Sequence, residues 1–170
     1  LRQAIESIPD AFALFDAQGN LAMHNTRFRE TYPSFRDAGE LTGRSFAELA
    51  RLVLRDIVDP TIEDDAEHWL AERVAEHGLA QHQSYERHLT DGRTLWISRK
   101  PTPDGGTVMV ASDISALKRA KNSLRDAIES IDAGFGLFDA HGKLVLHNDK
   151  FAPSIRRAMG PIVGLHFEEI

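Results

Sequence analysis

Apolar residues recur along the chain with two periods, one of about 3.6 residues and one of two, which predict short helices alternating with strands. Residues 1–8 carry an apolar face suited to a helix that Pro9 ends. Residues 12–16 and 21–24 are short apolar stretches separated by AQGN, a composition typical of a tight turn. The chain is therefore expected to open with a helix followed by a β-hairpin.

Three helix signals follow this hairpin. Asn25 stands where an N-cap belongs, directly ahead of a short amphipathic segment. Ser45 and Glu48 form a capping-box pattern for a helix that carries apolar residues as far as Ile57. A further helix is expected around Trp69.

The pattern then changes to the period of two. Residues 83–89, 93–101 and 107–114 are expected to form three antiparallel strands joined by glycine-containing turns. From Ser115 the helical period returns in a linker helix over residues 115–131. Its apolar positions have heptad spacing, interrupted by a lysine, and are Ile114, Leu117, Leu124, Ile128 and Ile131.

The opening of the chain is repeated near its end. Residues 1–28 and 124–151 align without a gap, and 17 of the 28 positions are identical. A shift of 123 residues suits a whole small domain rather than a solenoid unit. The truncated copy lacks closing strands, so we expect either poor order beyond about residue 132 or burial against a partner chain. The expected domains are residues 1–118 with the helix at 1–8, the connecting helix at 115–131, and the N-terminal part of a second domain at 132–170.

Several segments together resemble a PAS (Per–Arnt–Sim) sensor domain, of the kind repeated in bacterial sensor histidine kinases. They read AFALFDAQG (repeated as GFGLFDAHG), HN-x-x-F, WLAERVAEH and DGRTLWISRKPTPDGGTVMVASDIS. Asp113, Ile114 and Ser115 resemble the D-I-T/S signature that ends the PAS core. The resemblance implies an α+β fold, with a five-stranded antiparallel sheet, helices on one face and a small cavity between them.

The resemblance also implies a sensory or regulatory module of a bacterial signalling protein, with a histidine kinase as the leading identity of the parent protein. A signal would pass from Asp113–Ser115 through Leu117 and Leu124 to an output domain downstream in the same chain. The N-terminal and linker helices would also join two protomers in a homodimer. Two alternatives stay open: a diguanylate cyclase or phosphodiesterase output, and a ligand-free dimerisation module.

Composition narrows these possibilities. The chain is 42% hydrophobic and 27% charged, as in ordinary globular proteins, and its net charge of −6 offers no basic stripe for nucleic acid. No apolar run approaches the roughly 20 residues of a membrane span, so we expect no membrane contact and a cytoplasmic location. There is no cysteine, which excludes cysteine-linked chromophores. No catalytic constellation is apparent, so this segment is not expected to be an enzyme.

Three polar residues of the later strands are candidates for a ligand site, together with Trp69. If Tyr85, Arg87 and Arg99 point inward, their guanidinium groups suit a small carboxylate ligand. On a sheet with one wet face the preferred interpretation is that they point to solvent, and that Trp69 belongs to the core. The ligand itself is not identified by the sequence.

Histidines raise the question of cofactors and metals. His68 and His77 lie on a helix where haem-binding PAS relatives carry a ligand, but the preferred interpretation is that both are solvated. Haem and flavin are therefore not favoured. His82 and His88 would be about 20 Å apart on one strand, too far to share an ion, so no metal site is expected.

A His-Asn pair occurs in both copies of the repeat. Asn25 and Asn148 are expected to act as structural caps, since a side-chain oxygen there can accept a backbone N–H. His24 remains a candidate for the mouth of the cavity.

Overall fold

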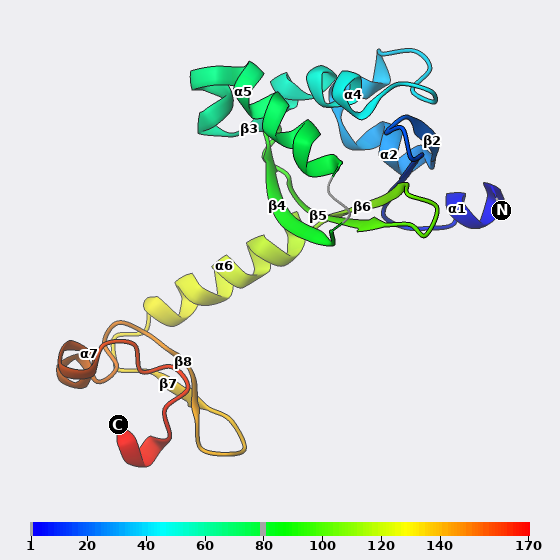
Figure 1. The fold of residues 1–170 in the computed structure, drawn as a ribbon. Coiled ribbons are helices and arrows are strands. Elements are labelled where there is room, and N and C mark those ends of the chain that lie inside the picture. Colours follow the sequence, from blue (N-terminus) through cyan, green and yellow to red (C-terminus); the bar gives the residue numbers. More distant parts are fainter. Residues whose placement is uncertain (1, 79–80) are drawn as a thin grey trace. The chain divides into compact units, whose positions relative to one another are not determined.

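The computed structural model describes residues 2–78 and 81–170 of the chain (Figure 1). These residues form two compact units, Leu1–Ser115 and Ala116–Ile170, although Leu1 itself lies outside the described residues. Each unit is described by itself.

A six-stranded antiparallel sheet forms the centre of the first unit. Its strand order is β2-β1-β6-β5-β4-β3. The expected α+β architecture with an antiparallel sheet is confirmed, and the short edge strand β3 is added to the five expected strands. The strands are β1 (Ala11–Phe15), β2 (Leu21–His24), β3 (Ile57–Val58), β4 (Gln83–Leu89), β5 (Thr94–Pro101) and β6 (Thr107–Asp113).

Helices cover one face of this sheet, as Figure 1 shows for the blue-to-green part of the chain. Two of the expected caps form as predicted: Ser45 and Glu48 make a complete capping box, and Asn25 accepts a hydrogen bond from the Phe28 backbone N–H. The helices are α1 (Arg2–Glu6), α2 (Thr26–Thr31), α3 (Pro33–Arg36), α4 (Phe46–Leu52), the 3₁₀ turn η1 (Leu54–Asp56) and α5 (Pro60–His77).

The helix expected to reach Ile57 ends earlier, at Leu52. The reason is tertiary: Ile57 pairs with Leu89 of β4, and the buried Asp56 carboxylate accepts a hydrogen bond from the Ser34 backbone N–H at 2.9 Å. These partners draw the chain into a 3₁₀ turn and an edge strand, and they outweigh the helical apolar pattern.

Alternation along the strands separates the two faces of the sheet. Phe15, Leu95 and Ile97 point toward the helices and are at most 2% exposed, whereas Trp96 on the opposite face is 41% exposed. Burying each large apolar side chain contributes about 1.5–3 kcal/mol, so this face provides the main stabilisation of the unit. The same face supplies the floor of the cavity described below.

The second unit consists of a helix, a hairpin and short helical segments. Leu144 and Ile162 are buried in it, while Leu137 and Val145 are about half exposed. Whether a partner chain covers these exposed residues stays a prediction. The elements are α6 (Ser115–Glu129), which begins at the last residue of the first unit, β7 (Gly136–Phe138), β8 (Leu144–His147), α7 (Pro153–Met159) and η2 (Phe167–Glu169).

Asn25 joins three parts of the first unit through one buried side chain. Its Oδ1 accepts hydrogen bonds from the backbone N–H groups of Phe12 and Phe28, both at 2.9 Å. Its Nδ2 donates to the carbonyl of Asp10 at 2.8 Å and lies 3.4 Å from that of Ile5 in α1. The residue is therefore more than the helix cap that the sequence predicted, because it also fixes α1 and β1.

Asn148 makes the corresponding bonds in the second unit, with one difference. Its Oδ1 accepts from Phe135 N–H at 2.9 Å and its Nδ2 donates to the carbonyl of Ala133 at 2.8 Å. Yet no helix begins after it, because the Phe151 N–H bonds to the Asn148 backbone carbonyl and α7 starts only at Pro153. The expectation that Asn148 caps a helix is wrong, although its other bonds follow the repeat.

Candidate functional site

A small cavity lies in the first unit between the inner face of the sheet and the helices. Its water-accessible volume is about 30 Å³, enough for one or two water molecules. Three arginines share this space with a mainly apolar lining. The lining consists of Phe15, Phe28, Tyr32, Phe35, Phe46, Leu49, Ala50, Val53, Trp69, Arg73, Arg87, Arg99 and Met109.

Arg99 points into the protein, contrary to the solvent-facing orientation preferred from the sequence. It shares the inner face of β5 with Leu95 and Ile97, and it is only 2% exposed. Its Nη2 donates a hydrogen bond to the Tyr85 hydroxyl, and its guanidinium carbon lies 5.2 Å from the centre of the Phe46 ring. These aromatic contacts make burial of the cation tolerable, since a ring face attracts a positive charge.

Arg87 also turns inward and reaches the same tyrosine. Its Nη2 donates to the Tyr85 hydroxyl at 3.2 Å and its Nη1 to the Tyr32 hydroxyl at 3.3 Å. Burial acts to lower the pKa of Arg87, but Tyr32, Tyr85 and Asp59 raise it above its ordinary value. Because the Tyr85 oxygen accepts from both arginines, two guanidinium groups lie close together at this end of the cavity.

Trp69 anchors α5 over the cavity. It is 3% exposed, and its indole N–H donates to the Asp59 carboxylate at 2.8 Å. Asp59 is also the N-cap of α5. The guanidinium carbon of Arg73 lies 5.7 Å from the Trp69 ring, and Arg73 pairs with Glu76 at 3.0 Å. The expected core position of Trp69 is confirmed, and it borders the cavity as well.

His77 is buried, whereas the sequence analysis preferred a solvated side chain. Its ring stacks on Phe46 with centroids 3.9 Å apart and an interplanar angle of 1°. Burial, and secondly the positive charge of Arg99, lower the pKa of His77 from 6.5 to about 4. His77 is therefore neutral at physiological pH. The expectation is correct for His68, which is exposed near Glu72.

His24 lies beside the cavity wall rather than in it. Its Nδ1 is 3.0 Å from the backbone carbonyl oxygen of Asn25, and its ring centre is 5.8 Å from that of Phe28. The residues lining the cavity do not include His24. The imidazole thus packs against the start of α2, and nothing in its contacts assigns it to a ligand.

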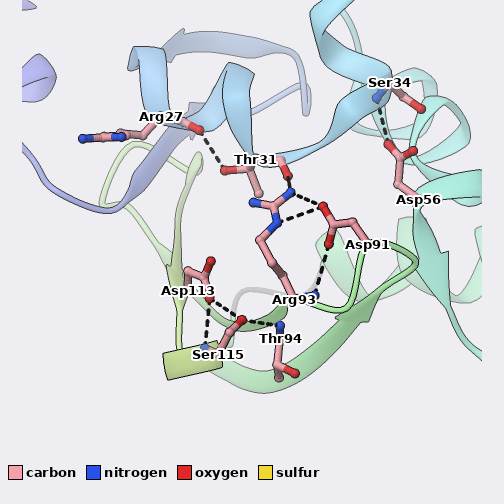
Figure 2. A network of polar contacts seen from close by, with 9 residues as sticks. All are labelled: Arg27, Thr31, Ser34, Asp56, Asp91, Arg93, Thr94, Asp113 and Ser115. Atoms are coloured by element: carbon pink, nitrogen blue, oxygen red, sulfur yellow. Dashed lines mark hydrogen bonds and ion pairs between the residues drawn. The ribbon is translucent and has the colours of Figure 1, made fainter. Parts of the chain in front are cut away.

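A second polar cluster lies where β6 ends and α6 begins (Figure 2). The buried Ser115 hydroxyl accepts a hydrogen bond from the Thr94 N–H at 2.9 Å and donates to the Asp113 carboxylate. Asp113 also accepts from the Ser115 backbone N–H, and Ile114 N–H bonds to the Thr94 carbonyl at 2.9 Å. The D-I-S segment therefore fastens the first turn of α6 to the first residue of β5.

Arg93 extends this cluster toward the cavity, a role that the sequence analysis missed. Figure 2 shows its guanidinium between the Asp91 carboxylate and the end of α2, where its Nη2 donates to the Thr31 carbonyl at 2.6 Å. Helix α2 carries Phe28, which lines the cavity. A continuous set of contacts thus joins the cavity wall, the start of β5 and the start of α6.

Two leucines of α6 have apolar side chains without cover. Leu117 is 69% exposed and Leu124 59% exposed. Neither leucine is therefore buried against a sheet in the described residues. Their role in a coiled coil stays a prediction.

Among residues 2–78 and 81–170, no group of three or more potential metal ligands occurs. Within the same ranges, no helix has the length and apolar character required to cross a membrane.

Comparison with known proteins decides the family. A model described as "PAS fold" matches residues 5–122, which include the whole sheet, the cavity and the first half of α6. The chain belongs to the PAS fold family. This PAS chain is 34% identical over 126 residues to the "Non-motile and phage-resistance protein" of Caulobacter vibrioides, covering 74% of the chain. It is 30% identical over 160 residues to "Sensor protein DivL" of the same organism, covering 88% of the chain.

The PAS chain spans only 13% and 20% of the lengths of these two relatives. Among solved structures, it is similar to the PAS domain of Bordetella pertussis BvgS, with 18% identity, a TM-score of 0.48, and coverage of 74% of this chain and 94% of that one. The PAS domain of an HTR-like protein from Haloarcula marismortui has 21% identity and a TM-score of 0.42, with coverage of 66% and 93%.

Proposed function

We propose that the chain is the sensory PAS module of a cytoplasmic bacterial signalling protein, with a sensor histidine kinase as the leading parent. The name of its relative DivL, a sensor protein, supports this proposal. The observation that carries it is the position of Ser115, whose hydroxyl links the Thr94 N–H of β5 to the first turn of α6. A change in the cavity that shifts β5 would reach α6 through this bond.

In this proposal residues 132–170 begin a second PAS domain, and α6 leads from one sensor to the next. The matching bonds of Asn25 and Asn148 support this interpretation, because they position a hairpin after a helix in both units. A cyclase or phosphodiesterase output would use the same relay and is distinguished only by the output domain.

Replacing Ser115 with alanine tests the relay. The variant leaves the buried Thr94 N–H without its acceptor, so the free energy of unfolding should fall by about 1–2 kcal/mol without loss of the fold. A bond worth about 1–2 kcal/mol can change an equilibrium about tenfold, because 1.4 kcal/mol corresponds to a factor of ten. In the full-length parent protein we therefore expect the rate of autophosphorylation to change at least about threefold.

Ser130→Ala is the matched control, because Ser130 is exposed and its hydroxyl bonds only to the nearby Ala127 carbonyl. It should leave the rate unchanged. Equal rates for Ser115→Ala and wild type would refute the relay, and absence of any kinase activity in the full-length protein would refute the histidine-kinase parent.

A ligand-free dimerisation module is the second candidate, and the small volume of the cavity favours it.

We propose that the chain forms dimers through the exposed leucines of α6, whether or not the cavity binds a ligand. Leu124→Lys should weaken the dimer at least about tenfold, because a charge would enter an apolar seam. Sedimentation equilibrium measures this, with the exposed Asn122→Lys as the control. A dimer of unchanged strength in Leu124→Lys would contradict the proposal.

A further inference from the structure

Arg99 holds a buried positive charge that the protein compensates only in part. Its guanidinium has five N–H donors, and the Nε and Nη1 atoms, which carry three of them, have no hydrogen-bond acceptor. Within residues 2–78 and 81–170, Arg99 contacts the Tyr85 hydroxyl and the rings of Tyr85 and Phe46, and it makes no ion pair with a carboxylate. Buried charges without a partner are costly, so such an arrangement is typical of a site that is completed by a ligand.

The surrounding charges reinforce this need for an anion. Arg87 shares the Tyr85 hydroxyl with Arg99, which brings a second guanidinium to the same end of the cavity. The Asp59 carboxylate accepts hydrogen bonds from Thr61 and Trp69, and its negative charge helps to raise the pKa of Arg87. Asp59 thus offsets part of the charge of Arg87, whereas Arg99 makes no ion pair with a carboxylate in the described part of the chain.

The rest of the lining limits the size and chemistry of that anion. Beyond the arginines the walls are aromatic and aliphatic, which suits a short hydrocarbon tail rather than a second charged group. The open volume of about 30 Å³ is far below the roughly 300 Å³ of a typical drug-sized pocket. Even a short carboxylate therefore enters only if the walls move outward, and each added carbon atom requires a larger movement. A guanidinium group pairs strongly with a carboxylate through charge-assisted hydrogen bonds.

We propose that this cavity binds a short-chain carboxylate of one to three carbon atoms, whose charged end is held by Arg99 and Arg87. The inference rests on the proposed sensory function and names the class of ligand sensed. The bound carboxylate also supplies hydrogen-bond acceptors for the Arg99 N–H groups that lack them. The arginines bind and orient the anion, and the apolar walls limit its length.

Calorimetric titration of the 170-residue chain with formate, acetate, propionate and butyrate tests the proposal. We expect saturable binding with a dissociation constant of about 1 mM for the best of the first three, and at least tenfold weaker binding of butyrate because its longer tail requires a larger movement of the walls. Propionamide, which is neutral and nearly the same shape as propionate, should not bind at up to about 50 mM.

Arg99→Gln should reduce the affinity at least about tenfold, whereas Arg119→Gln, which removes an exposed charge from α6, should leave it unchanged. If Arg99→Gln does not fold, Arg99→Lys is the alternative variant. It retains the positive charge but lacks the planar guanidinium that pairs with a carboxylate through two N–H groups, so it should also bind the carboxylate more weakly than wild type. The comparison of propionate with propionamide needs no variant.

Three results would overturn the proposal: no binding of any carboxylate, equal binding of propionamide, or full affinity in a folded Arg99 variant. Preferential binding of phosphate would also contradict it, because it would indicate a general anion site. Since the titration needs no output domain, its failure leaves the Ser115 test intact, and failure of the Ser115 test leaves carboxylate binding intact.

Discussion

Asn25→Ala should lower the free energy of unfolding of the first unit by about 3 kcal/mol. Asn25 is completely buried, and its side chain joins α1, β1 and the start of α2. Removing the amide leaves the N–H groups of Phe12 and Phe28 and the carbonyl of Asp10 without that partner. No water can easily replace three such bonds in the space of one side chain. The fall in the free energy of unfolding should therefore exceed the roughly 1 kcal/mol expected for the loss of a helix cap.

Urea denaturation followed by tryptophan fluorescence measures this change, because Trp69 and Trp96 both lie in the first unit. Asn122→Ala, at an exposed position of α6, is the control and should change the free energy by less than about 0.5 kcal/mol. Asn148→Ala should leave the fluorescence transition in place, because it affects the second unit. A loss below about 1 kcal/mol for Asn25→Ala would show that the amide network is not a main support of the fold.

The second large effect is a loss of stability in acid that depends on His77. In the folded protein the pKa of His77 is lowered to about 4, while the unfolded chain titrates near 6.5. Between these values the unfolded state binds a proton that the folded state does not, so stability is complete above pH 6.5 and falls as the pH approaches 4. We expect His77 to account for a loss of about 2 kcal/mol between pH 7 and pH 4.5.

His77→Phe removes the titrating group and keeps an aromatic ring to stack on Phe46. The difference in free energy of unfolding between this variant and wild type should therefore change by about 2 kcal/mol over that pH range. His68→Gln, on the exposed face of the same helix, should retain the wild-type pH dependence. If His77→Phe and wild type lose stability in parallel as the pH falls, His77 binds its proton as readily in the folded state as in the unfolded state. That result would contradict the lowered pKa of His77.

The sequence predicted the parts of the fold that depend on local signals. The bounds of β4, β5 and β6 follow from alternation between turns, and the capping box at Ser45 is made by residues three apart. The edge strand at Ile57 was missed because its partner, Leu89, lies on a strand far along the chain. Apolar periodicity cannot contain that information.

The candidate site was only partly predictable, for a related reason. Strict alternation places Arg99 on the same strand face as Leu95 and Ile97, but a general preference for solvated arginine favoured the solvent-facing interpretation. The compensating contacts of Arg99 come from Phe46 of α4 and Tyr85 of β4, whose meeting depends on tertiary packing. The stacking of His77 on Phe46 is equally non-local. The available signal was an arginine that follows two large aliphatic residues, Leu95 and Ile97, on one strand face.

We propose that occupation of the cavity changes the start of α6 through β5. The most direct test is ¹⁵N–¹H NMR of the 170-residue chain during titration with acetate, observing the Arg99 Nε–H and the backbone amides of Thr94 and Ser115. We expect all three resonances to shift with the same saturation curve. Saturation at Arg99 without any shift at Thr94 and Ser115, or no shift at Arg99 at all, would contradict it.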